Sequence, residues 1–251
     1  MQFPTLSRLL LALLVVAGPA CHAASEHPHD ESPAFQRCVG SAARTDELRA
    51  SDAVRAAAAA SAPAPVPAGV HQLLSRLLKS ARLPQGMQVK LHGVRDGRSA
   101  SVMSSGTIFL GSRLWAGDGA LSESELAAAL AHEIAHLEAA DVQQRLCDAV
   151  ASSGDETLAL AAATGATHRL ISTGRDDVAV RMMQRNHLRE LRADGRGARL
   201  LQAAGFQAGA MATMLLKVTV NGRGGSSGSH PAIETRLENL GVSLQQVVAG
   251  R

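Results

Sequence analysis

The chain of 251 residues is poor in aromatic side chains, with one Trp, four Phe and no Tyr. Proteins that bind single-stranded nucleic acid stack the bases on such side chains, so this class of function is disfavoured. The net charge is only +3, which argues neither for nor against a nucleic-acid partner. We expect one domain, or one domain with an appendage, and no nucleic-acid partner.

Cysteine is also scarce, and the three positions (Cys21, Cys38 and Cys147) include no C-x-x-C spacing. A zinc site made of cysteines is therefore not expected. If Cys21 carries a lipid, Cys38 and Cys147 remain as an even pair, which favours a disulfide in an oxidising compartment. The alternative is two free thiols, one buried and one exposed.

The apolar run near the N-terminus, residues 9–17, is too short to span a bilayer. It follows Arg8 and precedes small residues, so residues 1–20 are predicted to be a signal peptide. The small residues end at Ala20 and Cys21, which indicates a lipoprotein cleavage site with Cys21 as the lipidated residue. Ordinary cleavage after Ala20 or Ala23 is the alternative. The prediction is a protein of the bacterial periplasm that a lipid anchors to the outer membrane.

Residues 21–69 are predicted to be a tether that joins the signal peptide to a folded domain at 70–251. Three prolines lie at 62–69, so we expect this stretch to lack regular structure and to act as a semi-rigid spacer. A His-rich tract at 22–31 is interpreted as solvated linker, with weak metal capture as the alternative.

The most informative stretch is 131–137, A-H-E-I-A-H-L, because it contains an H-E-x-x-H pattern. On a helix, His132 and His136 lie one turn apart on the same face, so both can bind one zinc ion. Glu133 lies roughly 100° further round the helix, which is too far for a third ligand on the same arc. It is well placed to take a proton from a water bound to the metal.

The residues around this pattern support a helix. Ser122 and Glu125 form an S-x-x-E capping box, and apolar residues then follow a helical period: Leu126, Ala127, Leu130, Ile134 and Leu137. The helix is expected to continue through Cys147 to about residue 151. An amphipathic helix that merely exposes two histidines and a glutamate is the alternative interpretation.

A zinc peptidase needs a third protein ligand, and the candidate is Glu190, in a helix predicted at 176–204. Glu190 shares one face of that helix with His187 and Asp194. We expect Glu190 to bind the single zinc ion and Asp194 to orient one of the ligand histidines. The alternative is a solvated charged face, because four arginines surround these carboxylates: Arg185, Arg189, Arg192 and Arg196.

Further motifs follow in order: E-x-x-A-D at 190–194, A-G-F at 204–206, S-H-P at 229–231, and then Arg236. Over about residues 70–241 this order resembles the gluzincin family that contains HtpX, the CAAX prenyl protease and the periplasmic proteases BepA, LoiP and YcaL. In layout the chain is most similar to the lipoprotein proteases LoiP and YcaL. It departs from the family at 137–141, where members often carry a further His, and at 99–106, where they often carry N-A-F-A-x-P-G-G.

The resemblance implies a zinc-dependent endopeptidase with three ligands, His132, His136 and Glu190, and with Glu133 as the catalytic base. It also places His230 and Arg236 close to the metal. His230 would donate a hydrogen bond to the oxyanion, plug the open position of the zinc, or merely cap a helix. Arg236 would share the charge of the oxyanion or pair with a carboxylate such as Asp194.

The remaining pattern predicts an α+β fold, zincin-like and mainly helical, with a small sheet beside the active-site helix. Strands are expected at 86–94, 99–103 and 107–110, and further helices at 71–83, 155–172 and 207–220. A flexible loop at 221–229 should precede a last helix that Pro231 opens and that ends at Gly241. Trp115 is expected to pack under the active-site helix, with a place in a substrate pocket as the alternative.

The family resemblance further implies an enzyme that cleaves misfolded or misassembled cell-envelope proteins. In peptidases of this design an edge strand pairs with the substrate backbone, which gives a loose sequence preference. Components of the envelope assembly machinery are further candidate partners. The alternative function is a catalytically silent zinc-binding lipoprotein that acts as a chaperone or a scaffold.

Overall fold

The computed structural model describes Cys38 and residues 63–153, 176–221 and 230–249 of the chain. Several sequence predictions fall outside these residues and stay predictions. They are the signal peptide, the lipid site at Cys21, the His-rich tract, the helix expected at 155–172 and the loop before His230.

Four short strands form one mixed sheet in the order β1-β2-β4-β3. They are β1 (Pro63–Ala64), β2 (Lys90–Val94), β3 (Ala100–Val102) and β4 (Thr107–Gly111). The central strands β2 and β4 run parallel, and β1 and β3 pair antiparallel to them at the two edges. The three strands predicted from the sequence are present, each within a few residues of its expected bounds.

The prediction that 62–69 lacks regular structure is wrong. Pro63–Ala64 is the edge strand β1, helix α3 (Ala68–Leu78) begins before Val70, and Val66 packs against the core. Proline has no N–H to give to a sheet, but an edge strand needs donors on one side only. Within the described residues of this region, regular structure therefore starts at Pro63.

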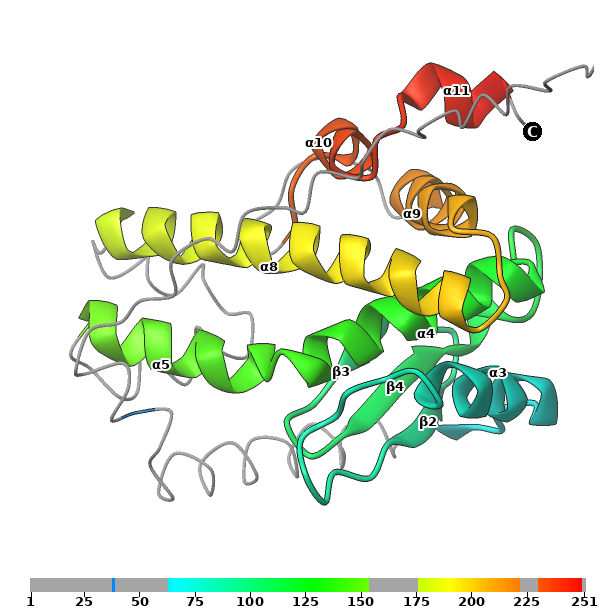
Figure 1. The fold of residues 1–251 in the computed structure, drawn as a ribbon, viewed down its shortest axis with the longest axis horizontal. Helices are drawn as coiled ribbons and strands as arrows, with labels where there is room; N and C mark the ends of the chain where they lie inside the picture. Colours follow the sequence, from blue (N-terminus) through cyan, green and yellow to red (C-terminus); the bar gives the residue numbers. More distant parts are fainter. Residues whose placement is uncertain (1–37, 39–62, 154–175, 222–229, 250–251) are drawn as a thin grey trace, which may run out of the picture.

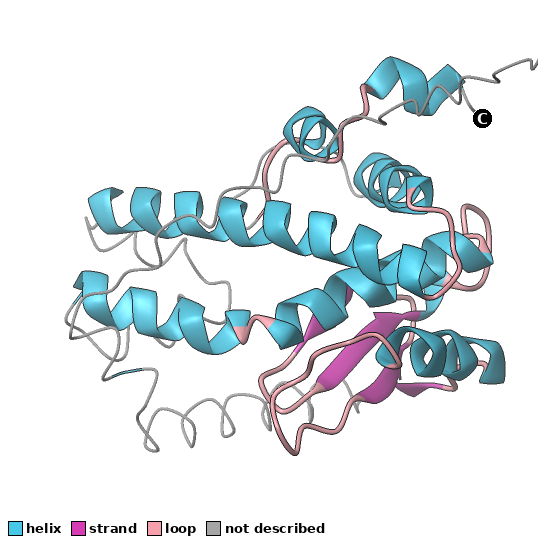
Figure 2. Cartoon of the chain, in the orientation of Figure 1, coloured by secondary structure: helices cyan, strands magenta, loops and turns pink. Residues whose placement is uncertain are grey.

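Helices make up most of the described chain, as Figure 2 shows. They follow the sheet in this order: η1 (Ser112–Leu114, a 3-10 turn), α4 (Glu123–Glu138), α5 (Asp141–Ser153), α8 (Asp176–Ala203), α9 (Gly209–Asn221), α10 (Ile233–Asn239) and α11 (Leu244–Ala249). Helix α8 lies along α5 and then α4, and the sheet lies on the other side of α4 (Figure 1). The predicted α+β, zincin-like fold class is confirmed.

Helix α4 is the centre of the fold. Its start is fixed by the predicted capping box, in which the Ser122 side chain accepts from the Glu125 N–H and the Glu125 carboxylate accepts from the Ser122 N–H. Every residue from 125 to 137 is buried, because the sheet, α3, α8 and α9 all pack against this helix. A helix with an exposed histidine face is therefore excluded.

The prediction that this helix continues to residue 151 is wrong. It ends at Glu138, and Ala140 has a left-handed backbone with φ 51°. Alanine favours helix and resists this conformation, which costs roughly 1–2 kcal/mol. The contacts of Asp141, described below, offset that cost. A new helix, α5, then starts at Asp141.

The C-terminal part also differs from expectation. Pro231 does not open helix α10, whose N-cap is Ala232. A further helix, α11, follows Gly241 and was not predicted, although Ser243 and Gln246 form an S-x-x-Q capping box that marks its start.

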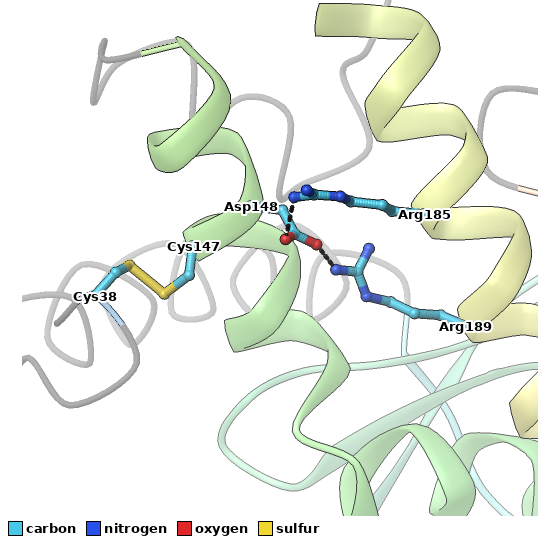
Figure 3. The surroundings of a disulfide bond; sticks show 5 residues. All are labelled: Cys38, Cys147, Asp148, Arg185 and Arg189. Carbon is cyan, nitrogen blue, oxygen red and sulfur yellow. Dashed lines mark hydrogen bonds and ion pairs between the residues drawn. A yellow bond between two sulfur atoms is a disulfide. The ribbon is translucent and has the colours of Figure 1, made fainter. Parts of the chain in front are cut away.

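Cys38 and Cys147 form a disulfide with a Cα–Cα distance of 5.5 Å (Figure 3). Of the two interpretations of these cysteines, the disulfide is therefore correct and the pair of free thiols is wrong.

In the described part of the chain, no helix combines the length and the apolar character needed to cross a membrane.

Candidate metal centre

Three buried side chains from α4 and α8 converge in the middle of the molecule. The Nε2 atoms of His132 and His136 lie 3.0 Å apart. The two carboxylate oxygens of Glu190 lie 3.3 Å from His132 Nε2 and 3.5 Å from His136 Nε2. One ligand atom from each residue lies within 4.8 Å of the others, so the three can hold one metal ion.

A glycine allows α8 to approach α4 this closely. A Cβ atom built on Gly197 would lie 3.2 Å from the backbone N of His132 and 2.5 Å from the side chain of Met211. A larger residue would displace the end of the Met211 side chain and would leave a tight contact with the α4 backbone. The sequence of α8 thus brings Glu190 and Asp194, which lie within two turns of Gly197, to the candidate ligand histidines.

Asp194 lies behind His132, one of the two candidate ligand histidines. Its Oδ1 atom is 3.0 Å from His132 Nδ1, and its side chain is completely buried. Arg236 from α10 donates two hydrogen bonds to this carboxylate, at 2.8 and 2.7 Å. Of the two contacts proposed for Arg236, the structure has the pairing with Asp194.

Asp141 lies behind His136 and is hydrogen-bonded to it, and sequence reasoning missed it. Its Oδ2 atom is 2.7 Å from His136 Nδ1, and its side chain is 1% exposed. The residue falls in the stretch 137–141, where the chain departs from the family pattern. That departure was the only feature of the sequence that pointed to a special role for Asp141.

The charges in the centre favour a cation. Oε2 of Glu190 is buried and, among the described residues, accepts no hydrogen bond of good geometry. Burial alone would raise the pKa of Glu190, but His136 and His132 lower it well below its usual range. Burial would likewise lower the pKa of His132, but Asp194 and Glu190 raise it to about 10. Two imidazoles and a carboxylate are ligands that zinc prefers, so the residues fit the metal.

Glu133 is next to His132, the first candidate ligand, and is 6% exposed. Burial raises the pKa of its carboxyl group, and the neighbouring His132 and His136 lower it by less. A carboxylate with a raised pKa is suited to accept a proton and release it again within one reaction.

His230 lies at the rim of the centre. Its Nε2 atom is 3.5 Å from Glu190 Oε2, and its side chain is 52% exposed. It is not the N-cap residue of α10, because that position is Ala232. His230 therefore lies beside a candidate metal ligand and remains open to solvent.

The other predicted residues are placed as follows. Trp115 is partly buried and packs against the main core. His187 is half-buried and is not among the three residues that converge. The charged-face alternative is wrong, because Glu190 and Asp194 are 4% and 0% exposed. The four arginines instead pair with carboxylates of α4 and α5: Glu138, Asp141 and Asp148.

Comparison with known protein families agrees with this centre. Residues 67–242, more than two thirds of the chain, match the model of peptidase family M48. A comparison with curated proteins gave no match. M48 peptidases are zinc-dependent, and the converging His132, His136 and Glu190 could bind a metal ion. The chain therefore belongs to peptidase family M48.

Proposed function

We propose that this protein is a zinc-dependent endopeptidase, with one zinc ion per chain held by His132, His136 and Glu190. One observation carries the proposal: the three side chains converge, buried, beside Glu133 in a chain of the M48 family. A cluster of acidic residues and histidines without the family match would be much weaker evidence for a zinc peptidase. The fold, the ligands and the candidate base all point to the same chemistry.

The reaction follows from the placement of Glu133. Zinc, when bound, supplies Lewis acidity that lowers the pKa of a water molecule to about 7 and polarises a carbonyl. Glu133 takes the proton from the attacking water and passes it to the amine that leaves. The raised pKa of Glu133 helps the protonated form to persist long enough for this second transfer.

Strand β3 is the proposed binding site for the substrate backbone. It is the last strand of the sheet, pairs with β4 on one side and packs next to α4. Within the described residues no strand covers its other edge. An extended peptide that adds to this edge would be held by main-chain hydrogen bonds, which are independent of side-chain identity. Cleavage inside chains with a loose sequence preference follows from this mode.

The proposed location is the bacterial periplasm, with a lipid on Cys21 as the anchor to the outer membrane. The disulfide between Cys38 and Cys147 supports an oxidising compartment, and the predicted signal peptide agrees with export. Misfolded or misassembled envelope proteins are the proposed substrates, with the envelope assembly machinery as a partner. The layout similar to LoiP and YcaL is part of this proposal.

The test is a zinc assay combined with casein hydrolysis on the purified protein, with and without a chelator. Wild type should bind one zinc ion and cleave casein, and the chelator should abolish cleavage. Glu133→Gln should keep the zinc and lose roughly 10²–10⁴-fold in rate, because the ligands stay while the base is lost. Glu190→Ala should instead lose the zinc.

Three outcomes would count against the proposal. Undiminished cleavage by Glu133→Gln would exclude the mechanism, and stoichiometric, tightly held zinc in Glu190→Ala would exclude the ligand set. Zinc binding without cleavage of casein or other unfolded proteins would favour the silent chaperone or scaffold.

A further inference from the structure

Asp141 connects a metal-ligand histidine to two arginines. Its Oδ2 atom is 2.7 Å from His136 Nδ1. Its Oδ1 atom contacts the Arg192 guanidinium and lies 3.9 Å from Arg189 Nε. The Asp141 side chain is 1% exposed, so water contributes little to the stability of its charge, and the arginines must do so instead.

The break between α4 and α5 makes this contact. On a continuous helix, residue 141 would lie roughly 140° round the axis from His136, where it cannot reach that ring. The left-handed Ala140, at φ 51°, turns the chain so that Asp141 starts a new helix. Gln144 fastens the turn, because its side-chain amide donates to the Ala139 carbonyl at 2.9 Å and its N–H donates to the Ala140 carbonyl at 3.0 Å.

We propose that Asp141 is a positioning residue of the zinc centre. It accepts the Nδ1–H of His136, which fixes the ring orientation and leaves Nε2 as the metal-binding atom. The centre then has two parallel arrangements, Asp194 with Arg236 behind His132 and Asp141 with Arg192 behind His136. This inference rests on the proposed zinc site and adds a residue to it.

A purely structural role is the competing explanation, and Asp148 provides the matched control. Asp148 lies two turns further along α5, is 3% exposed, and pairs with Arg185 and Arg189 (Figure 3). In the described part of the chain its ion pairs involve these arginines and neither ligand histidine. Replacing Asp141 or Asp148 thus removes a similar buried ion pair between α5 and α8, but only Asp141 contacts the metal ligands.

The experiment compares full-length Asp141→Ala, Asp141→Asn and Asp148→Ala. Zinc affinity is measured by competition with a chromophoric chelator, and the visible absorption of the cobalt-substituted protein reports the ligand geometry. Asp141→Ala should bind zinc roughly 10–100-fold more weakly and change the cobalt spectrum. Asp148→Ala should keep wild-type affinity and spectrum, even if its unfolding transition moves. Asp141→Asn, which keeps an acceptor near His136 but lacks the charge, should lie between wild type and Asp141→Ala.

Two results would overturn the inference: wild-type zinc affinity in both Asp141 variants, or an equal loss of affinity in Asp141→Ala and Asp148→Ala. If Asp141→Ala does not fold, Asp141→Asn decides, because it has nearly the same shape as the native residue. A wild-type protein that binds no zinc would instead refute the proposed function, so the two failures can be told apart.

Discussion

Arg236 and Asp194 form a buried ion pair with two hydrogen bonds, although they are 42 residues apart in the chain. The pair fastens α10 to α8 directly behind His132, whose Nδ1 lies 3.0 Å from the same carboxylate. Helix α10 therefore contacts the candidate metal centre through Asp194 without supplying a ligand.

Arg236→Ala should strongly destabilise the protein and weaken zinc binding. Breaking a buried ion pair by removing one partner leaves an uncompensated charge and costs about 3–5 kcal/mol. Arg236→Lys should recover only part of this, because an ammonium group cannot make the two parallel bonds. Denaturant unfolding and zinc titration are the measurements. Arg113→Ala, which removes the exposed pair with Asp96 at 3.2 Å, is the control and should cost at most about 1 kcal/mol.

His230→Ala should lower kcat. The side chain is half-exposed beside Glu190, where it can reach a bound substrate, and loss of one oxyanion donor costs roughly 10²–10³-fold in kcat. Steady-state hydrolysis of a quenched peptide measures the effect. His187→Ala on α8 is the matched control and should keep wild-type activity. A higher basal rate in His230→Ala would show that the residue plugs the centre instead.

Glu125 provides a pH dependence that does not involve the metal ligands. Burial alone would raise its pKa, but the ion pair with Lys217, at 2.5 Å, and the Ser122 hydrogen bonds lower it below its usual value of 4.5. A group with a lowered pKa in the folded state adds stability above its unfolded pKa and loses it as the pH falls through the folded pKa.

Glu125→Gln should therefore be less stable than wild type by about 1 kcal/mol at pH 7. Glutamine preserves the capping box and removes only the charge. The difference in the free energy of unfolding should stay constant down to about pH 5 and shrink below pH 4.5. Urea unfolding of both proteins across this range measures it. Both proteins share the metal centre, so its own acid sensitivity cancels. An equal difference at pH 3 and pH 7 would contradict the prediction.

Loss of the disulfide should destabilise the fold and leave the metal centre intact. The bond closes a loop between positions 109 residues apart, for which chain entropy gives a contribution of about 4–5 kcal/mol and measurement typically gives 2–4 kcal/mol. Cys38→Ser and reduction by a phosphine, which does not compete for zinc as a dithiol does, should lower the free energy of unfolding equally. A further drop when the phosphine is added to Cys38→Ser would show that something other than this bond is responsible.

The parts of the site that follow a regular helical period could be predicted from the sequence. His132, Glu133 and His136 lie within one helix, and Glu190 and Asp194 are spaced to share one face of another, so each placement needed only local geometry. The order of the motifs implied that these side chains converge. It did not explain the convergence, which depends on the close approach of α8 to α4 at Gly197.

The parts that depend on tertiary contacts could not be predicted. Ala139 and Ala140 contain no helix breaker, so the turn that delivers Asp141 is invisible until its contacts with His136 and the arginines are known. Strand β1 was not predicted because proline normally argues against a strand. It is compatible with β1 only because this strand lies at the edge of the sheet. The pairing of Cys38 with Cys147 was favoured by the number of cysteines, but sequence spacing could not exclude two free thiols because it does not show where the chain folds back.

The disulfide also sets how far the enzyme can work from a membrane, if Cys21 is its anchor as proposed. The sequence separates Cys21 from Cys38 by 17 positions and from Pro63 by 42. Fully extended, these lengths correspond to at most about 60 Å and about 150 Å. The covalent link between Cys38 and α5 thus reduces the maximum distance between the lipid anchor and the folded part to less than half. Only substrates close to the bilayer would then be within reach of the enzyme.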